Sequence, residues 1–172
     1  MEKWDIFDAN GIPTGKVTTR GRAVLRLGEY HLVVHIWVVS SSGKFLLQRR
    51  SDKKKLMPGE WAATGGAAIR GETSFRAAQR ELFEELGIES SSENLMKLTR
   101  IKRKNSFVDV WMIVSDAKIS DLKLQKSEVA EAKWVSKAEL EEMIAEGKYH
   151  NYGDEYFDCI FEKIDDFRGA YI

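Results

Sequence analysis

The chain has 172 residues, 43% hydrophobic and 31% charged, which predicts one compact domain with a sizeable core and a soluble surface. Lys plus Arg and Asp plus Glu both number 27, and this balance argues against a protein that binds nucleic-acid polymers. The one cysteine excludes an internal disulfide framework, and the sequence has neither an apolar signal core nor a membrane-length run, so we expect a cytoplasmic protein without a membrane partner.

The N-terminal residues predict a short β-hairpin. Residues 3–8 (KWDIFD) alternate in polarity as a strand does, and Asn10-Gly11 is a turn signal. With Gly15 beyond this turn, the hairpin is expected to span about residues 3–19. Residues 20–29 (RGRAVLRLGE) are ambiguous between a strand and a connecting loop.

Two strands and a basic loop follow. Residues 31–39 are dense in β-branched and aromatic side chains, and a Ser-Ser-Ser-Gly turn leads to a second strand at 44–49. The loop RRSDKKKLMPGEW is then broken by Pro58-Gly59. We expect residues 61–63 to be short and extended, with Gly65 and Gly66 in a loop where backbone can approach a metal or phosphate closely.

The segment from about residue 74 to 86 predicts a helix with two distinct faces. Thr73 or Ser74 offers an N-cap oxygen, and Gly87 stands where a left-handed C-cap residue belongs. Helical geometry gathers one stripe of apolar side chains: Phe75, Ala78, Leu82 and Leu86. It places three carboxylates on a separate arc of about 100°: Glu81, Glu84 and Glu85.

Three carboxylates this close together repel one another, and a divalent cation with oxygen ligands would remove the repulsion. A solvated acidic face is the alternative for three glutamates alone. The surrounding residues favour a metal site, because Arg80 can hold a carboxylate in place and Gly65 lies just before the helix. We therefore expect Mg²⁺ or Mn²⁺ at Glu81, Glu84, Glu85 and the backbone of Gly65.

Residues 66–88 read GAAIRGETSFRAAQRELFEELGI and fit the pattern G-x5-E-x7-R-E-U-x-E-E-x-G-U, with U apolar. At ordinary residue frequencies, a chance match has odds on the order of one in ten million. The chain is identified on this motif as a member of the Nudix hydrolases. The resemblance implies an α/β/α sandwich with a mixed β-sheet and a single domain over residues 1–172. Glu72 is expected to be a structural member of the motif.

Beyond the motif, the sequence predicts further strands and two late helices. Strands are expected at 95–102, 106–114 and 133–135, whereas 117–130 is weakly patterned. Ser136 is the expected cap of a helix that runs to about Glu146, and residues 155–167 predict a final amphipathic helix. The tryptophans at positions 37, 61, 111 and 134 are expected in the core rather than as stacking platforms for a base.

Residues 4–88 also resemble a Nudix subgroup related to isopentenyl-diphosphate isomerase, on the segments WDIFDANG-PTG, HLVVHIWV and LLQRRSDKKKLMPGEWAATGG. This resemblance implies that Arg50 and Lys54 contact a diphosphate, and it matches His31 to a histidine metal ligand, although a structural or surface role is the alternative. The isomerases' catalytic cysteine is missing, since Thr64-Gly65-Gly66 stands in its place. Cys159, in the C-terminal helix pattern, is expected in the core.

We therefore expect a metal-dependent hydrolase that cleaves the pyrophosphate of a nucleoside diphosphate linked to another group, or of a nucleotide. An isomerase and a non-catalytic diphosphate-binding module are the alternatives. The partner is a small-molecule diphosphate, and a homodimer is possible. The general base is expected to be Glu81 or a later glutamate, with Glu128 ahead of Glu131, while Asp109 on the 106–114 strand is expected to bind substrate.

Overall fold

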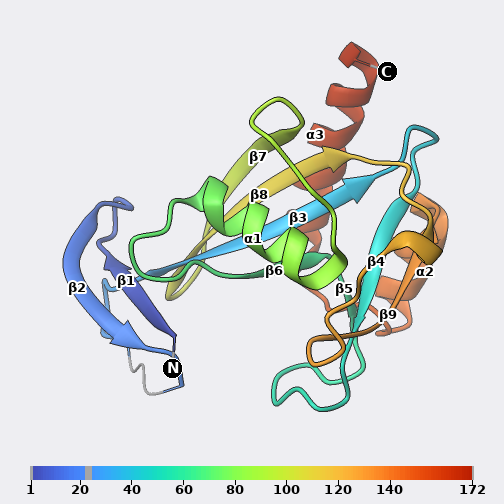
Figure 1. Ribbon diagram of the computed structural model, residues 1–172. Coiled ribbons are helices and arrows are strands. Elements are labelled where there is room, and N and C mark those ends of the chain that lie inside the picture. The colour runs from blue at the N-terminus through green and yellow to red at the C-terminus, as the bar shows by residue number, and fades with distance from the viewer. Residues whose placement is uncertain (1, 22–24, 172) are drawn as a thin grey trace.

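The computed structural model describes residues 2–21 and 25–171, and a seven-stranded mixed sheet forms its centre (Figure 1). Five strands follow one another in the order β5-β4-β3-β8-β7, while β6 pairs with β3 and β9 pairs with β4. The strands are β3 (His31–Val39), β4 (Phe45–Arg50), β5 (Trp61–Ala62), β6 (Thr64–Ala67), β7 (Leu95–Lys102), β8 (Ser106–Val114) and β9 (Val129–Val135).

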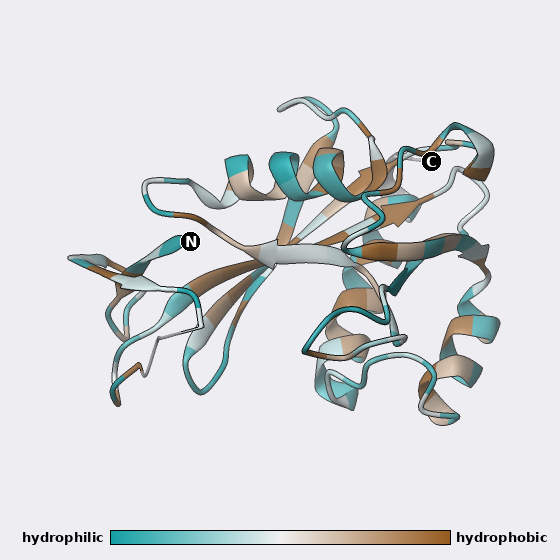
Figure 2. Ribbon diagram, turned by 60° about the horizontal axis from the view of Figure 1, so that its bottom comes forward, coloured by the Kyte–Doolittle hydropathy of each residue, from teal (hydrophilic) through white to brown (hydrophobic). Residues whose placement is uncertain are grey.

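The central pair, β3 and β8, runs parallel over nine residues, from His31 beside Ser106 to Val39 beside Val114. The other pairs in this sheet are antiparallel. Both central strands read as nearly continuous apolar runs, as expected for strands covered on both faces. Most strands in Figure 2 are accordingly coloured hydrophobic along much of their length.

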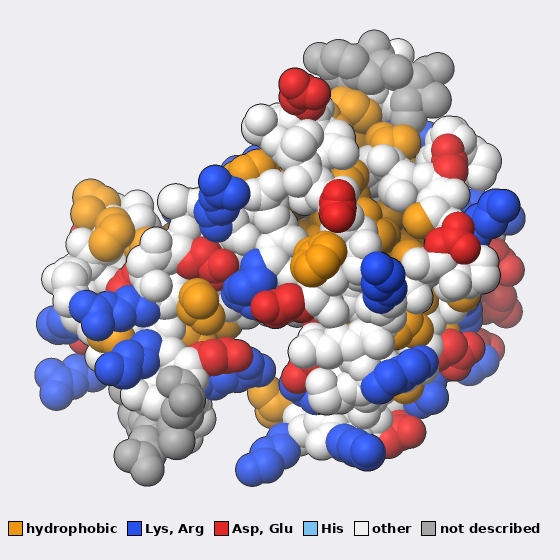
Figure 3. Space-filling view, viewed as in Figure 1, with side chains coloured by type: hydrophobic (Ala, Val, Ile, Leu, Met, Phe, Trp, Pro, Cys, Tyr) orange, Lys and Arg blue, Asp and Glu red, His pale blue; other side chains and the backbone are white. Residues whose placement is uncertain are grey.

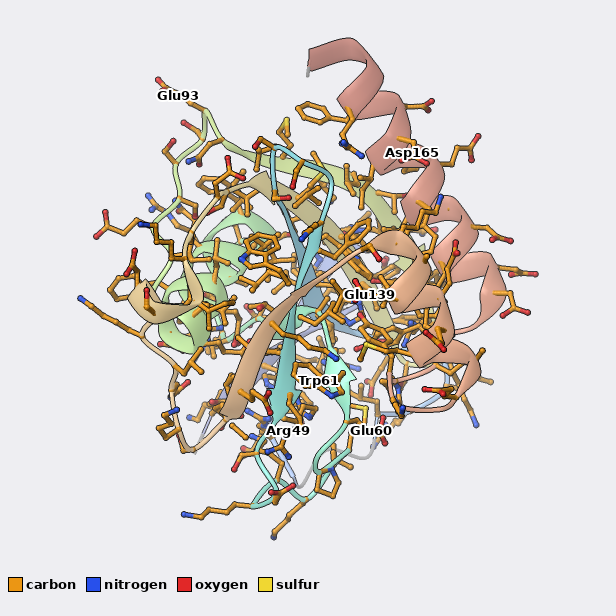
Figure 4. All side chains as sticks on the ribbon, turned by 90° about the vertical axis from the view of Figure 1, so that its right-hand side faces the viewer. Arg49, Glu60, Trp61, Glu93, Glu139 and Asp165 are labelled. Carbon is orange, nitrogen blue, oxygen red and sulfur yellow. The ribbon has the colours of Figure 1, made fainter. Side chains whose placement is uncertain are left out.

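Helices cover the two faces of this sheet. Helix α1 (Ser74–Leu86) packs on one face through a core that includes Val34, Ile36 and Leu82. Helices α2 (Lys137–Ala145) and α3 (Asp154–Tyr171) share the other core, which includes Trp37. Figure 4 shows this layering on edge, with Glu139 and Asp165 on the helical layer opposite α1, and confirms the α/β/α sandwich expected from the sequence.

The ends of α1 form as its sequence predicts. The Thr73 hydroxyl accepts a hydrogen bond from the Arg76 N–H, and Gly87 ends the helix with a φ of 72°. The apolar stripe is buried at Ala78, Leu82 and Leu86, whereas Phe75 is only half-buried. One member of the expected acidic arc, Glu85, is buried as well.

The N-terminal hairpin is a small sheet of its own, made of β1 (Lys3–Phe7) and β2 (Pro13–Thr19). Among the described residues, one isolated backbone bridge, between Phe7 and Tyr30, joins it to the main body. Two further hydrogen bonds tie it to the loop before α1: Arg70 N–H donates to the Lys3 carbonyl at 2.8 Å, and Gly71 N–H donates to Asp5 Oδ2 at 2.6 Å. Within the ambiguous segment 20–29, residues 22–24 lie outside the described residues, and the rest is loop.

Several boundaries differ from the sequence prediction. β9 begins at Val129 rather than 133, because it pairs with β4 along almost its whole length. Gly65 and Gly66 lie in β6 rather than in a loop, where pairing with β3 fixes their backbone. Cys159 is only partly buried, so its assignment to the core was wrong.

No helix of the described chain is long and apolar enough to span a membrane.

Ser136 forms a capping box with Glu139 at the start of α2, where the sequence predicts its cap. Helix α3 is longer than the predicted 155–167 and ends at Tyr171.

Replacing Leu82 with alanine tests how much the packing of α1 contributes to stability. Leu82 is fully buried between α1 and the sheet, so its loss should lower the free energy of unfolding by about 2–5 kcal/mol. The neighbouring Phe83 is 55% exposed, and Phe83→Ala should change that free energy by less than about 0.5 kcal/mol. Urea denaturation measures both, and similar losses in the two variants would contradict this packing.

Candidate active site

A cavity of about 330 Å³ lies where the acidic face of α1 meets β6, the N-terminal hairpin and two loops beside β4 and β9. Figure 3 shows the surface hollowed between the hairpin, at the left, and the main body. The three motif glutamates, Glu81, Glu84 and Glu85, all line this cavity. The volume is in the usual range for a small-molecule site.

Glu85 is the most deeply buried of these acids, with 3% of its surface exposed. Its Oε2 accepts hydrogen bonds from Gln48 Nε2 at 2.8 Å and from Gly65 N–H at 3.2 Å. Both donors are neutral, and no Lys, Arg or His of the described chain forms an ion pair with it. Burial, with repulsion from Glu81, raises the pKa of Glu85 to about 8.

Arg80 organises the other acids. Its guanidinium holds both oxygens of Glu72, at 2.9 and 3.0 Å, and donates to Glu81 at 2.8 Å and to Glu84 at 3.2 Å. A further bond reaches the Ala67 carbonyl at 3.2 Å, on β6. The hydrogen bond with Glu72 is the main reason that the pKa of Arg80 is raised. Burial raises the pKa of Glu81, and the attraction of Arg80 only partly opposes it.

The chemistry of these donors fits a hard divalent cation. Glu85 is a buried carboxylate with neutral partners alone, and a positive charge would favour its ionised form. The missing Cβ of Gly66 makes room for the acid, since one there would lie 2.3 Å from Glu81 Oε1. Arg80 forms hydrogen bonds with Glu81 and Glu84. In the described chain, no three acidic, His or Cys side chains lie close enough together to hold an ion as they stand. Arg80 donates to one oxygen of each carboxylate, Glu81 Oε1 and Glu84 Oε2, so the second oxygen of each is available to a cation.

The opposite wall of the cavity is cationic. Arg50 and Lys54 line it from the end of β4 and the loop that follows. Glu128, from the loop before β9, also lines the cavity and forms an ion pair with Lys54. Glu131 instead pairs with Arg49 at 3.4 Å and is absent from the described cavity lining, so Glu128 is the later glutamate beside the site. Figure 4 shows Arg49 at this end of the sheet, near Trp61 and Glu60.

Asp109 does not line the described cavity, contrary to its expected role in substrate binding. It is fully buried and bound by Arg100 Nε at 2.5 Å and Lys97 Nζ at 2.7 Å, both from the neighbouring strand β7. Burial by itself would raise the pKa of Asp109, but the hydrogen bonds from Arg100, Lys97 and Ser74 outweigh it and lower the pKa. The Asp109 carboxylate on β8 is thus bonded to two cations on β7, and these bonds link the two strands.

His31 is also absent from the described cavity lining. Its ring stacks on Trp4 of the hairpin, with centroids 4.5 Å apart and planes 10° apart. Burial lowers the pKa of His31 to about 4, so the ring is neutral near pH 7. The structure gives it a packing role behind the cavity wall.

His35 is a cavity residue that sequence reasoning missed. Its Nδ1 lies 2.9 Å from the Tyr156 hydroxyl, which also accepts a hydrogen bond from Trp37 Nε1 at 3.1 Å. Because the indole can only donate, the simplest assignment has Tyr156 O–H donate to Nδ1, which places the histidine proton on Nε2. Burial lowers the pKa of His35 to about 3, so it is a neutral donor. A histidine in the middle of an otherwise apolar strand was the available signal.

Among the other lining residues that sequence reasoning missed, four come from segments far from the motif. Three belong to or flank the hairpin, and one precedes α3: Glu2, Trp4, Arg20 and Tyr152. Nothing in the sequence joins these positions to residues 66–88. Their proximity is a result of the tertiary fold.

Comparisons with known proteins identify the family of the chain. Residues 29–154 match the family model of the NUDIX domain. An uncharacterised Nudix hydrolase of Listeria monocytogenes is 40% identical over 153 residues, which cover 88% of this chain and 90% of that protein. The isopentenyl-diphosphate Delta-isomerase of Pectobacterium atrosepticum is 30% identical over 106 residues, 60% of this chain and 58% of the isomerase. A crystal structure from Deinococcus radiodurans superposes with a TM-score of 0.76 at 26% identity, covering 92% of this chain and 97% of that one.

The burial of Glu85 predicts a pH dependence of stability in the metal-free protein. Its folded pKa of about 8 exceeds its ordinary value of 4.5, so its contribution is fully present below pH 4.5 and is lost as the pH rises through 8. Between these limits, the free energy of unfolding of wild type should fall by roughly 2–5 kcal/mol relative to Glu85→Gln. Urea denaturation in the presence of a chelator measures this difference.

The matched control is Glu84→Gln on the same helix, where the side chain is 47% exposed. This variant should keep the pH slope of wild type. Parallel slopes for wild type and Glu85→Gln would show that the Glu85 carboxylate is not the buried acid described above.

Proposed function

The chain belongs to the Nudix hydrolases and is a hydrolase acting on pyrophosphate bonds, and from this premise we propose its substrate class and its metal. The proposed substrate is a nucleoside diphosphate linked to a further group, or a nucleotide, and the proposed metal is Mg²⁺ or Mn²⁺. One observation carries the proposal. A buried carboxylate without a basic partner, Glu85, shares one cavity with Arg50 and Lys54 on the opposite wall.

In this proposal Glu81, Glu84 and Glu85 would hold the metal. A bound divalent cation would neutralise phosphate oxygens and lower the pKa of a nearby water. Arg80 orients Glu81 and Glu84 through the hydrogen bonds described above. Arg50 and Lys54 would bind the diphosphate from the other side, so that its charge is matched on both walls.

The proposed reaction is an in-line displacement by water. The water oxygen forms a bond to one phosphorus while the bond from that phosphorus to the bridging oxygen breaks. The proton of the water passes to a carboxylate, and the bridging oxygen leaves with the other phosphate. In this proposal His35, a neutral residue that lines the cavity, would donate a hydrogen bond to an oxygen of the bound substrate.

Two carboxylates that line the cavity are the proposed candidates for the proton acceptor. Glu81 is mostly buried and bonded to Arg80, whereas Glu128 is paired with Lys54. Replacing the true base with glutamine should lower kcat by about 10²–10⁴-fold and remove the acidic limb of the pH–rate profile. The other replacement should lower the rate but keep that limb. If both variants keep the limb, neither residue is the base.

The isomerase alternative lacks a placed cysteine. Cys159 lies on α3, and it is absent from the described lining of the cavity that contains the glutamates. Isomerisation of a prenyl diphosphate needs groups that add and remove protons at carbon, and this chain does not supply the cysteine that the isomerases use. The geometry favours hydrolysis.

A panel of nucleoside, sugar, dinucleotide and prenyl diphosphates, incubated with Mg²⁺ or Mn²⁺, tests the proposal. Wild type should convert at least one class to phosphate or nucleoside monophosphate, and Glu84→Gln should lower its kcat/KM by about 10²–10⁴-fold. The control is Glu162→Gln, an exposed position on α3, which should be unaffected. If wild type converts none of these compounds, the proposed function is wrong.

A further inference from the structure

The N-terminal hairpin forms one side of the cavity, although it lies outside the Nudix motif. Glu2, Trp4 and Arg20 line the same cavity as the motif glutamates. Figure 3 shows the hairpin standing across the hollow from the main body. A ligand that fills the cavity would therefore contact the hairpin as well as α1.

Trp4 is held firmly on this wall. One face of its indole stacks on His31, with centroids 4.5 Å apart and planes 10° apart. Its two neighbours in the chain, Lys3 and Asp5, are the residues that bind the loop before α1, at 2.8 and 2.6 Å. The indole is thus fixed from behind and from both sides, and little conformational entropy remains to be lost when a ligand binds.

The other face of Trp4 has no stacking partner among the described residues. Among the described residues, Trp4 has one aromatic contact, with His31, and no Lys or Arg lies over its indole ring. Its Nε1–H is buried without a hydrogen-bond acceptor in the described structure.

The loop between β4 and β5 faces the hairpin across the cavity and carries both charge and apolar surface. Lys54 provides a cation for a diphosphate, while Leu56 and Met57 line the same cavity two and three residues later. Leu56 is 71% exposed, and its carbonyl accepts a hydrogen bond from Arg50 Nε at 3.2 Å. A molecule with an anionic end and a flat apolar end matches this arrangement.

The rim of the hairpin wall is polar. Glu2 and Arg20 form an ion pair at 2.7 Å, with side chains about half exposed, and both line the cavity. A carboxylate and a guanidinium beside an indole can hydrogen-bond the edge of a heterocycle, whereas a hydrocarbon chain would leave them without partners. The polar rim therefore favours a nucleobase over a prenyl group.

We propose that the hairpin is the specificity element of this enzyme and that Trp4 stacks on the nucleobase of the substrate, opposite Leu56 and Met57. This inference rests on the proposed function, because it assigns the base-binding part of the same cavity. It selects nucleoside diphosphate compounds from the diphosphate classes that the motif alone would accept. Trp4 acts in binding and takes no part in the bond-breaking step.

The test compares a nucleoside diphosphate with ribose 5-diphosphate, which lacks only the base. Trp4→Leu keeps apolar bulk but removes the π face, and Trp4→Phe keeps a ring. Trp4→Leu should lower kcat/KM for the nucleoside diphosphate by about 10–100-fold, mostly through KM, because base stacking is uniform binding energy. Ribose 5-diphosphate should change by less than about twofold, and Trp4→Phe should keep most of the activity on both.

Ile12→Ala is the matched control, since Ile12 is a hairpin residue that is 59% exposed and absent from the described cavity lining. It should leave both substrates unchanged. If Trp4→Leu lowers both substrates equally, Trp4 only supports the fold and the inference is wrong. If Trp4→Leu changes neither, the inference is also wrong, while hydrolysis by wild type would still support the proposed function.

A binding measurement separates the two proposals when no turnover is found. Calorimetry with an α,β-methylene nucleoside diphosphate and Mg²⁺ reports binding without hydrolysis. Binding by wild type that weakens about 10–100-fold in Trp4→Leu would support base stacking even if the proposed hydrolysis failed. Equal binding by the two proteins, or no binding by wild type, would overturn the role of Trp4.

Discussion

The burial of one carboxylate constrains much of the architecture around the cavity. Glu85 is taken out of water at the inner end of the acidic face of α1, and its hydrogen bonds come from Gln48 on β4 and from the Gly65 backbone on β6. Burial raises the pKa of Glu85 because its hydrogen-bond partners are neutral, and a bound cation would favour the ionised form. The site is therefore arranged around an acid that has no basic hydrogen-bond partner in the described chain.

A continuous set of hydrogen bonds connects the hairpin to the acidic helix. The hairpin holds the loop at residues 70–71, and Glu72 at the end of that loop holds Arg80. Arg80 in turn holds Glu81 and Glu84. A disturbance of the hairpin is thus expected to affect both sides of the cavity, because one network positions the proposed base-binding wall and the proposed metal ligands.

Opposite charges occupy opposite walls of the cavity, and this division matches the parts of a nucleoside diphosphate. Arg50 and Lys54 face the glutamates across the space for the diphosphate, while Trp4 and Leu56 flank the space assigned to the base. The groups proposed to bind the base are far from the motif in sequence. This separation explains how an intact hydrolase motif can coexist with substrate selection by other segments.

The sequence by itself determined the motif helix and the fold class. Thr73 and Gly87 act through neighbouring backbone, and the spacing of Leu82 and Leu86 follows from helical geometry, so local rules were sufficient. The apolar runs at 31–39 and 106–114 also identified β3 and β8 as strands. These features depend on residues close together in the chain, whereas the parallel pairing of β3 with β8 joins distant segments and came only from the structure.

Tertiary structure alone decided the partners of the polar side chains. Asp109 was expected to bind substrate, but cations from β7 enclose it, and a strand pattern specifies a face without naming the neighbour across it. Trp4 and His35 reach the cavity because the hairpin and β3 meet α1 in space, across more than 40 residues of chain. Long-range packing sets such contacts, and no local periodicity encodes them.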